Sequence, residues 1–289
     1  MKIVLGTAQF GSKYGISNQG GFIDSHIARE IINYAQLNGI DTIDTAASYE
    51  NSESILGNMD LKNFRVITKL SSPNNIDKSD LKEWINNQVK LSMNTLKVSQ
   101  LEGLLIHNTI DMDLNSIKLI WNNMKILKEK KIVNKIGFSI YCPSEIEVWI
   151  KYCNPDIVQC PYNVFDRRII YSSFFEELKK NGTQIHARSI FLQGLLLMER
   201  NKMPQYFQKW NEVFIKWKEW LMQNKLSPLE GCLNIAYNEK NLDKIVIGIE
   251  NKKQLKQILS FNPLDQINYI EDLSVDEVEL LNPYMWKLK

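Results

Sequence analysis

The sequence has few of the residues from which metal sites and disulfides are built. Its 289 residues include only four cysteines and three histidines, and no two of the cysteines form a Cys-x-x-Cys pair. Structural zinc requires clustered ligands, so we expect no metal site. The expected state of the cysteines is a free, buried thiol. They are Cys142, Cys153, Cys160 and Cys232.

Neither sign of charge predominates, and long apolar runs are lacking. Thirty-five basic and 33 acidic residues leave a formal net charge of +2, which argues against broad electrostatic binding of nucleic acid or an anionic membrane. No stretch approaches 18 consecutive apolar residues, and the apolar run within residues 1–6 is too short for a signal peptide. We therefore expect a soluble, cytoplasmic protein.

Short β-like runs alternate with amphipathic helical stretches almost from end to end, which is typical of parallel βαβ units. Eight strands with intervening helices make a closed (β/α)8 TIM barrel of the α/β class more economical than an open sheet. No linker, repeat or low-complexity tract interrupts the chain, so we expect one domain over residues 1–289. The expected strands are 2–7, 41–44, 65–69, 102–107, 134–139, 157–159, 184–187 and 244–247.

Two segments do not fit a simple alternation of eight strands and eight helices. Residues 195–241 are too long for one barrel helix and are rich in aromatic side chains. They form either a lid or substrate wall, or an ordinary amphipathic helix whose buried face carries Trp210, Phe214, Trp217 and Leu221. In the tail, residues 274–277 have capping-box spacing for a last helix. Residues 274–289 either lie across the mouth of the barrel or pack on its outer surface.

Ionisable side chains close three successive expected strands. Asp44 ends the second, with Tyr49 five residues later, Lys69 ends the third, and His107 ends the fourth. Each of these residues alone has an ordinary structural explanation as a cap, a loop aromatic or a solvated charge. Parallel α/β barrels keep their active sites at the carboxyl ends of the strands, so we expect the four side chains to meet at one rim.

These four residue types suit the reduction of a carbonyl by hydride. The carbonyl oxygen needs a proton as it gains charge, and Tyr49 can donate one if a nearby ammonium stabilises the phenolate. Lys69 would supply that ammonium, and Asp44 would pair with Lys69 and fix its position. His107 would donate a hydrogen bond to the substrate oxygen or share the proton.

The sequence resembles the aldo/keto reductase family over essentially its whole length. The matching stretches are 5–11, 43–46 with Tyr49, 66–69, 105–107, 136–139, 158–159 with 162–163, and 246–248. The resemblance implies a (β/α)8 barrel that acts as an NAD(P)H-dependent oxidoreductase. Its substrate would be an aldehyde, a ketone or a sugar-derived carbonyl, with the four residues in the roles just described.

The resemblance also implies a set of cofactor-binding residues. Ser139 and Gln159 would hold the nicotinamide carboxamide, and Arg188 would pack on the nicotinamide ring, where an aromatic residue is usual. The loop after Gly248 would meet the adenosine phosphate at a helix N-terminus. The remaining expected cofactor residues are Thr7, Ser189, Phe191, Glu250, Asn251 and Gln254.

Three positions depart from the family's pattern: Ile140, where a second carboxamide ligand is common, Arg188, and Glu250. Glu250 would repel the 2′-phosphate of NADPH and could accept a hydrogen bond from a free ribose hydroxyl, which favours NADH. Lys252 and Lys253 could still compensate for the charge of Glu250. The expected cofactor is NADPH, with NADH as the alternative.

Two other functions stay open beside the reductase. The same departures suggest a cofactor-sensing or regulatory barrel with little or no turnover. A lysine at a strand end also suggests a lyase that forms a Schiff base through Lys69, although pairing with Asp44 would make that amine a poor nucleophile.

Residues 187–195 are similar to family members from bacterial surface-sugar biosynthesis, which favours a sugar-derived substrate.

Overall fold

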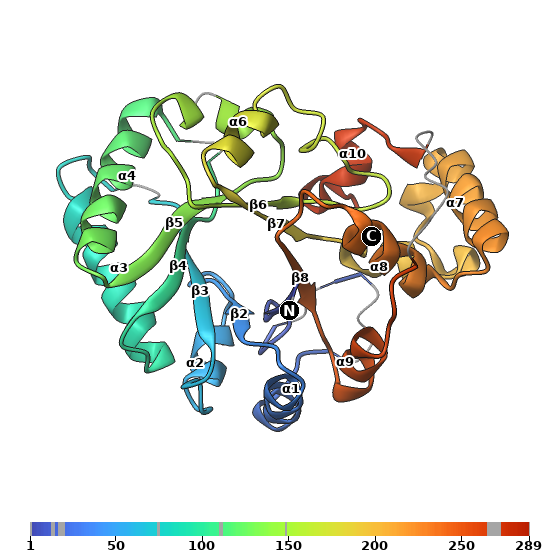
Figure 1. The fold of residues 1–289 in the computed structure, drawn as a ribbon, viewed down its shortest axis with the longest axis horizontal. Coiled ribbons are helices and arrows are strands. Elements are labelled where there is room, and N and C mark those ends of the chain that lie inside the picture. Colours follow the sequence, from blue (N-terminus) through green and yellow to red (C-terminus); the bar gives the residue numbers. More distant parts are fainter. Residues whose placement is uncertain are drawn as a thin grey trace.

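Eight parallel strands close into a barrel in chain order, from β1 to β8 and back to β1 (Figure 1). The computed structural model describes residues 2–12, 15–16, 21–73, 76–109, 112–147, 149–264 and 273–288. The strands are β1 (Ile3–Gly6), β2 (Thr42–Asp44), β3 (Arg65–Leu70), β4 (Leu101–Ile106), β5 (Val133–Ser139), β6 (Ile157–Pro161), β7 (Gln184–Arg188) and β8 (Lys244–Gly248). The prediction of a single (β/α)8 barrel is confirmed.

The helices surround the barrel because their apolar stripes must be buried against the strands. In α3, for example, Ile85 and Val89 are buried four residues apart, whereas Asn86 and Lys90 are exposed. The helices that cover the barrel are α1 (Ser25–Leu37), α2 (Ser52–Leu56), α3 (Leu81–Leu96), α4 (Leu114–Glu129), α5 (Ser144–Glu147), α6 (Phe175–Lys180), α8 (Pro228–Asn238) and α9 (Lys252–Leu259). None of the helices in the described ranges is long and apolar enough to cross a lipid bilayer.

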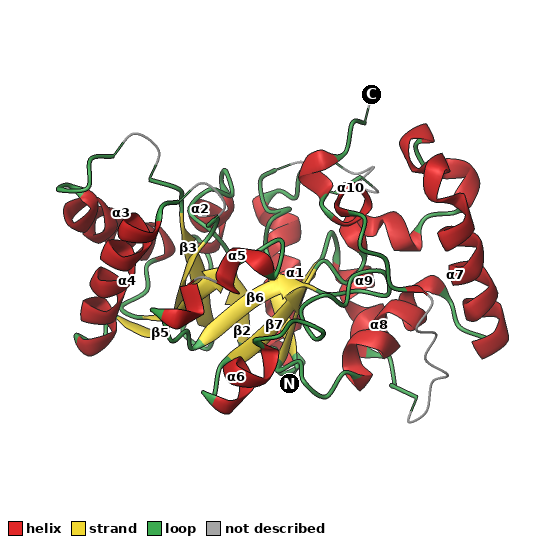
Figure 2. Cartoon of the chain, turned by 90° about the horizontal axis from the view of Figure 1, so that it is seen from above, coloured by secondary structure: helices red, strands yellow, loops and turns green. Residues whose placement is uncertain are grey.

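The long segment between β7 and β8 is not one helix. Three 3-10 helices, η2 (Leu192–Leu197), η3 (Arg200–Lys202) and η4 (Gln205–Trp210), lead into α7 (Asn211–Asn224), and α8 follows. Both views place α7 at the opposite end of the molecule from α3 and α4 (Figures 1 and 2).

The predicted buried face of this segment is present. Phe214, Trp217 and Leu221 of α7 and the preceding Trp210 are all buried, as an amphipathic helix requires. α8 then starts with a capping box, in which Ser227 Oγ accepts from the Glu230 N–H and the Glu230 carboxylate accepts from the Ser227 N–H.

The tail differs from the sequence-based expectation. Its last helix, α10 (Val278–Leu281), begins four residues after Ser274, and its N-cap residue Glu277 makes no side-chain cap. The predicted capping box is therefore wrong. Beyond α10, Trp286 packs edge-on against Phe207, with ring centroids 4.9 Å apart, while Tyr284 meets Tyr141, in the loop after β5, at 5.1 Å. The tail therefore reaches the rim at the carboxyl ends of the strands.

Candidate active site

A buried ion pair lies at the carboxyl ends of β2 and β3. Lys69 Nζ donates to Asp44 Oδ1 at 2.5 Å and to the carbonyl of Thr45 at 2.8 Å, and both charged side chains are buried. From β6, Gln159 Nε2 donates to the other oxygen of Asp44 at 2.7 Å. Each carboxylate oxygen of Asp44 thus has a donor. Burial lowers the pKa of Lys69, and the charge of Asp44 opposes that shift.

Tyr49 and His107 lie beside this pair. The Tyr49 ring is edge-on to the His107 ring, with centroids 5.5 Å apart, and Lys69 Nζ lies 5.1 Å from the centroid of the Tyr49 ring. Ser48 Oγ is 2.9 Å from His107 Nδ1. Burial, then the charges of Lys69 and Arg188, lowers the pKa of His107 to about 3, so the imidazole is neutral near pH 7. The structure therefore brings the four predicted side chains together.

The predicted carboxamide pocket is a pair of polar side chains on neighbouring strands. Ser139, at the end of β5, donates from its hydroxyl to Gln159 Oε1 at 3.4 Å, and both residues are buried. The side chain of Ile140 is fully buried in the hydrophobic core. Its backbone carbonyl accepts a hydrogen bond from Arg188 Nη2 at 2.9 Å.

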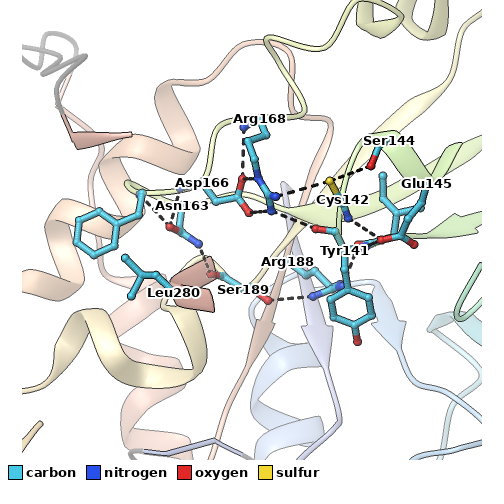
Figure 3. A network of polar contacts seen from close by, with 12 residues as sticks. Tyr141, Cys142, Ser144, Glu145, Asn163, Asp166, Arg168, Arg188, Ser189 and Leu280 are labelled. Carbon is cyan, nitrogen blue, oxygen red and sulfur yellow. Dashed lines mark hydrogen bonds and ion pairs between the residues drawn. The ribbon is translucent and has the colours of Figure 1, made fainter. Parts of the chain in front are cut away.

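A polar network fixes the loops that follow β5, β6 and β7 (Figure 3). Arg188 donates to Ser189 Oγ at 3.1 Å, and its guanidinium lies 4.2 Å from the centre of the Tyr141 ring. Tyr141 is itself held through its backbone, because its carbonyl accepts from Arg168 and its N–H donates to Glu145. The guanidinium of Arg188 is thus held by residues of the loops after β5 and β7.

A cavity of about 540 Å³ opens beside these side chains. Asp44, Tyr49, Gln159 and Arg188 line it on the side of the ion pair. The remaining lining residues include members of β1, β8, α8, α9, η2 and the loop after β7. The predicted cofactor residues on its wall are Thr7, Gln159, Arg188, Ser189, Phe191, Gly248, Glu250 and Gln254. Four predicted residues are not on the wall, and they are Lys69, His107, Ser139 and Asn251. Because Lys69 is buried behind the wall and hydrogen-bonded twice, the geometry does not favour a Schiff base on this amine.

The start of α9 holds Glu250 at the cavity. Gln254 Oε1 accepts from the Glu250 N–H at 2.8 Å, and Gln254 Nε2 donates to the Glu250 carboxylate at 3.1 Å. Asn251 is the N-cap of the helix and accepts from the N–H of Gln254. Lys252 Nζ instead lies 5.4 Å from the ring of Tyr34 on α1, and exposed Lys253 is not on the wall either.

Sequence reasoning missed several wall residues. Gln9 lies so close to Gly248 that a Cβ there would approach its side-chain nitrogen to 2.4 Å, and its buried Oε1 has no hydrogen-bond partner among the described residues. Gln9 falls within a stretch that carries the family resemblance, which was an available signal. Leu229, at the start of α8, also lines the cavity. The segment 195–241 therefore contributes part of the cavity wall, through residues that include Leu197 and Leu229.

The cysteines and histidines of the described ranges form no metal-binding cluster. Within the described ranges, no group of three or more His, Cys, Asp or Glu side chains is placed to hold a metal ion.

The sequence model of the Aldo/keto reductase family matches residues 2–274. No curated protein sequence matches the chain.

Several solved structures share the fold. The holo form of an aldo-keto reductase from Bacillus halodurans has a TM-score of 0.71 and 19% identity, covering 91% of this chain and 88% of its own. A glycerol dehydrogenase from Gluconobacter oxydans has a TM-score of 0.67 and 19% identity, and the match covers 93% of this chain and 95% of the dehydrogenase. A Bombyx mori aldo-keto reductase in complex with NADP has a TM-score of 0.66 and 17% identity, and the match covers 94% of this chain and 86% of the reductase. At these identities the likeness shows the fold.

Proposed function

The chain belongs to the aldo/keto reductase family, and from that premise we propose that it reduces a small aldehyde, ketone or sugar-derived carbonyl with NADH or NADPH. The observation that carries the proposal is the buried Asp44–Lys69 pair beside the ring of Tyr49, at the wall of a cavity large enough for an extended ligand. Such a pair places a fixed positive charge next to a phenol, which is what a tyrosine acid requires.

In this proposal each side chain has one task. Tyr49 donates the proton to the carbonyl oxygen, and Lys69 stabilises the phenolate that remains. Asp44 holds Lys69 in place, and the amide of Gln159 holds Asp44. His107 is neutral, and if Ser48 donates to its Nδ1, then Nε2 carries the proton and can donate to the substrate oxygen. The bound cofactor supplies the hydride.

The residues that line the cavity and its rim fit a nicotinamide dinucleotide. The Ser139–Gln159 pair offers a hydroxyl and a carbonyl oxygen to a carboxamide, and the buried Oε1 of Gln9 offers an acceptor at the cavity wall. Arg188, Ser189 and Phe191 would line the middle of the dinucleotide site. Thr7, which also lines the cavity, donates from its hydroxyl to the backbone carbonyl of Asp44. The adenosine end would meet Gly248, Glu250, Asn251 and Gln254.

The test of the proton donor is Tyr49→Phe. We expect turnover of a carbonyl panel to fall about 10²–10⁴-fold, because the variant keeps the ring but loses the acidic proton. Binding of the nicotinamide cofactor, followed by fluorescence, and the thermal midpoint should change little. Turnover close to that of the parent protein would remove Tyr49 from the role.

The choice of cofactor follows from Glu250. Its carboxylate stands at the cavity, and neither Lys252 nor Lys253 is placed to offset it, so the geometry favours NADH, the alternative expected from the sequence, over NADPH. We expect NADH to bind at least about tenfold more tightly than NADPH. Roughly 1.4 kcal/mol of repulsion between Glu250 and the 2′-phosphate would change the dissociation constant by a factor of ten.

Fluorescence titration of both cofactors tests this argument. Glu250→Gln should reduce the difference in affinity between NADH and NADPH, and Glu250→Arg should reverse the preference. Lys253→Gln should leave the two affinities unchanged. Equal affinity of the parent protein for both cofactors would defeat the argument from charge.

A cofactor-sensing barrel is the second candidate. It is favoured by one observation, that the carbonyl of Ile140 is bonded by Arg188 at a position where the family commonly offers an amide to the carboxamide. Tight cofactor binding without turnover across the carbonyl panel would favour this candidate over the reductase.

A further inference from the structure

Three buried hydroxyl groups form a hydrogen-bonded chain that ends on Asp44. They belong to Thr7 after β1, Thr45 after β2 and Ser52 at the start of α2, and all three residues are 0% exposed. Ser52 Oγ lies 3.0 Å from Thr45 Oγ1 and donates to Thr7 Oγ1 at 2.9 Å, and the Thr7 carbonyl is also within its reach at 3.0 Å. Because the Thr7 hydroxyl donates to the Asp44 carbonyl at 3.0 Å, it accepts from Ser52, and Ser52 accepts from Thr45.

Both ends of this chain lie on residues that hold Lys69. Thr45, where the chain starts, accepts a hydrogen bond from Lys69 Nζ through its carbonyl at 2.8 Å. Asp44, where the chain ends, accepts from the same ammonium through its carboxylate at 2.5 Å. Ser52 links the two, so the loss of its hydroxyl disturbs both anchors of the ammonium.

Ser52 also closes the turn that carries Tyr49. Its N–H donates to the Tyr49 carbonyl at 2.7 Å, and the N–H of Tyr49 donates to the Ala46 carbonyl at 3.0 Å. The next residue, Glu50, has a φ of +31°, which is a strained value for a residue other than glycine. A strained backbone persists only where neighbouring contacts fix it, and Ser52 supplies one of those contacts.

On the basis of the proposed function, we infer that Ser52 is a positioning residue, which fixes the Tyr49 ring at its distance from the Lys69 ammonium. One residue ties the turn of the phenol to the two anchors of that ammonium, whose Nζ lies 5.1 Å from the ring centroid. A displacement of about 1 Å in an active site can cost about a hundredfold in rate, so the tie acts on turnover more than on binding. The competing explanation is an ordinary buried serine that contributes only stability.

The test of this inference is Ser52→Ala, which removes the hydroxyl and with it the acceptor of Thr45. We expect kcat for 4-nitrobenzaldehyde to fall about 10–100-fold, while KM and the dissociation constant of the cofactor change by less than about twofold. The alkaline limb of the pH profile of kcat should move to higher pH, because a less firmly placed ammonium stabilises the phenolate less. Ser52→Cys keeps a weak donor and should recover part of the rate.

Two further variants complete the set. Ser92→Ala removes the hydroxyl of a serine on α3 that is 4% exposed and lies outside the chain, so it should leave kcat and its pH profile unchanged. Thr45→Val breaks the first link of the chain with little change in shape. It should lower kcat in the same direction as Ser52→Ala, and it tests the inference even if Ser52→Ala does not fold.

Hydrogen exchange separates this inference from the proposed function. In a peptide that covers residues 46–56, backbone amides should exchange about tenfold or more faster in Ser52→Ala than in the parent protein, while a peptide from α3 stays unchanged. Faster exchange confined to this turn supports the inference even if the parent protein reduces no carbonyl, in which case only the reductase assignment fails.

Two outcomes overturn the inference. One is a Ser52→Ala variant whose kcat and exchange equal those of the parent protein. The other is a loss of kcat that Ser92→Ala reproduces, that follows the fall in thermal midpoint and that leaves the pH profile in place, which would make Ser52 an ordinary structural serine.

Discussion

Replacing His186 with leucine should make the protein less sensitive to acid. His186 lies on β7 two residues before Arg188, so strand alternation places both on the inner face of the barrel. It is 2% exposed, and neither ring nitrogen has a hydrogen-bond partner among the described residues. Burial is the main cause that lowers its pKa to about 3, followed by the charge of Lys135, while Asp243 opposes the shift.

The size of the effect follows from linkage. The pKa of the histidine falls from 6.5 in the unfolded chain to about 3 in the folded one. Its contribution to stability is therefore complete above pH 6.5 and is lost progressively as the pH falls toward 3. At pH 5, about 1.5 units below the unfolded pKa, protonation of the unfolded chain removes about 2 kcal/mol. Leucine removes this loss, and it also removes a buried ring without partners, which should add about 1–3 kcal/mol at every pH.

The assay is guanidinium denaturation at pH 7.5 and pH 5.0. Between these two values, the parent protein should lose about 2 kcal/mol more of its unfolding free energy than His186→Leu does. His186→Gln is the matched control, because glutamine does not titrate but keeps a buried polar group. It should share the reduced acid sensitivity without the gain in stability. An equal loss in the parent protein and the leucine variant would refute the assignment of His186 as a buried neutral base.

Two further predictions concern buried charge and buried thiols. Lys69→Met should destabilise the fold by about 3–5 kcal/mol in chemical denaturation, because it leaves Asp44 buried without its cation, and Asp44→Asn in the same chain should restore much of that loss. In native protein only Cys142 should react with a thiol reagent, since burial raises the pKa of Cys153 and Cys160 to about 12 and also raises that of Cys232; rapid reaction of two or more thiols before unfolding would contradict this.

The strands and their ends were predictable because both follow from local pattern. Every expected strand overlaps an observed one, with bounds that differ by no more than two residues. Asp44 and Lys69 stand out because charges at the ends of apolar runs are conspicuous in the sequence. That their side chains meet follows from parallel pairing, in which Asp44 lies beside Ile67, two residues before Lys69.

The rest of the site depends on contacts between segments far apart in the chain. Leu229 reaches the cavity because the aromatic segment before it packs as three 3-10 helices and α7, and their path cannot be read from periodicity. Ser274 satisfies the spacing of a capping box, yet tertiary contacts of the tail with Tyr206 and Phe207 place the last helix later. Likewise, the sequence offered Lys252 as a phosphate ligand, and only the structure shows it over Tyr34.

The burial of the Asp44–Lys69 pair is better explained by chemistry than by stability. Moving two charges out of water costs several kcal/mol for each ion, and apolar residues of similar volume would often be equally stable or more so. Here both oxygens of Asp44 are satisfied, and Lys69 has a second acceptor in the Thr45 carbonyl. These bonds offset the cost of burial and fix the ammonium beside Tyr49. The proposed role of Lys69 as a fixed charge beside Tyr49 would require such an arrangement. If the double variant Asp44→Asn, Lys69→Met proves at least as stable as the parent protein but turns over no carbonyl, stability and catalysis are separated at this site.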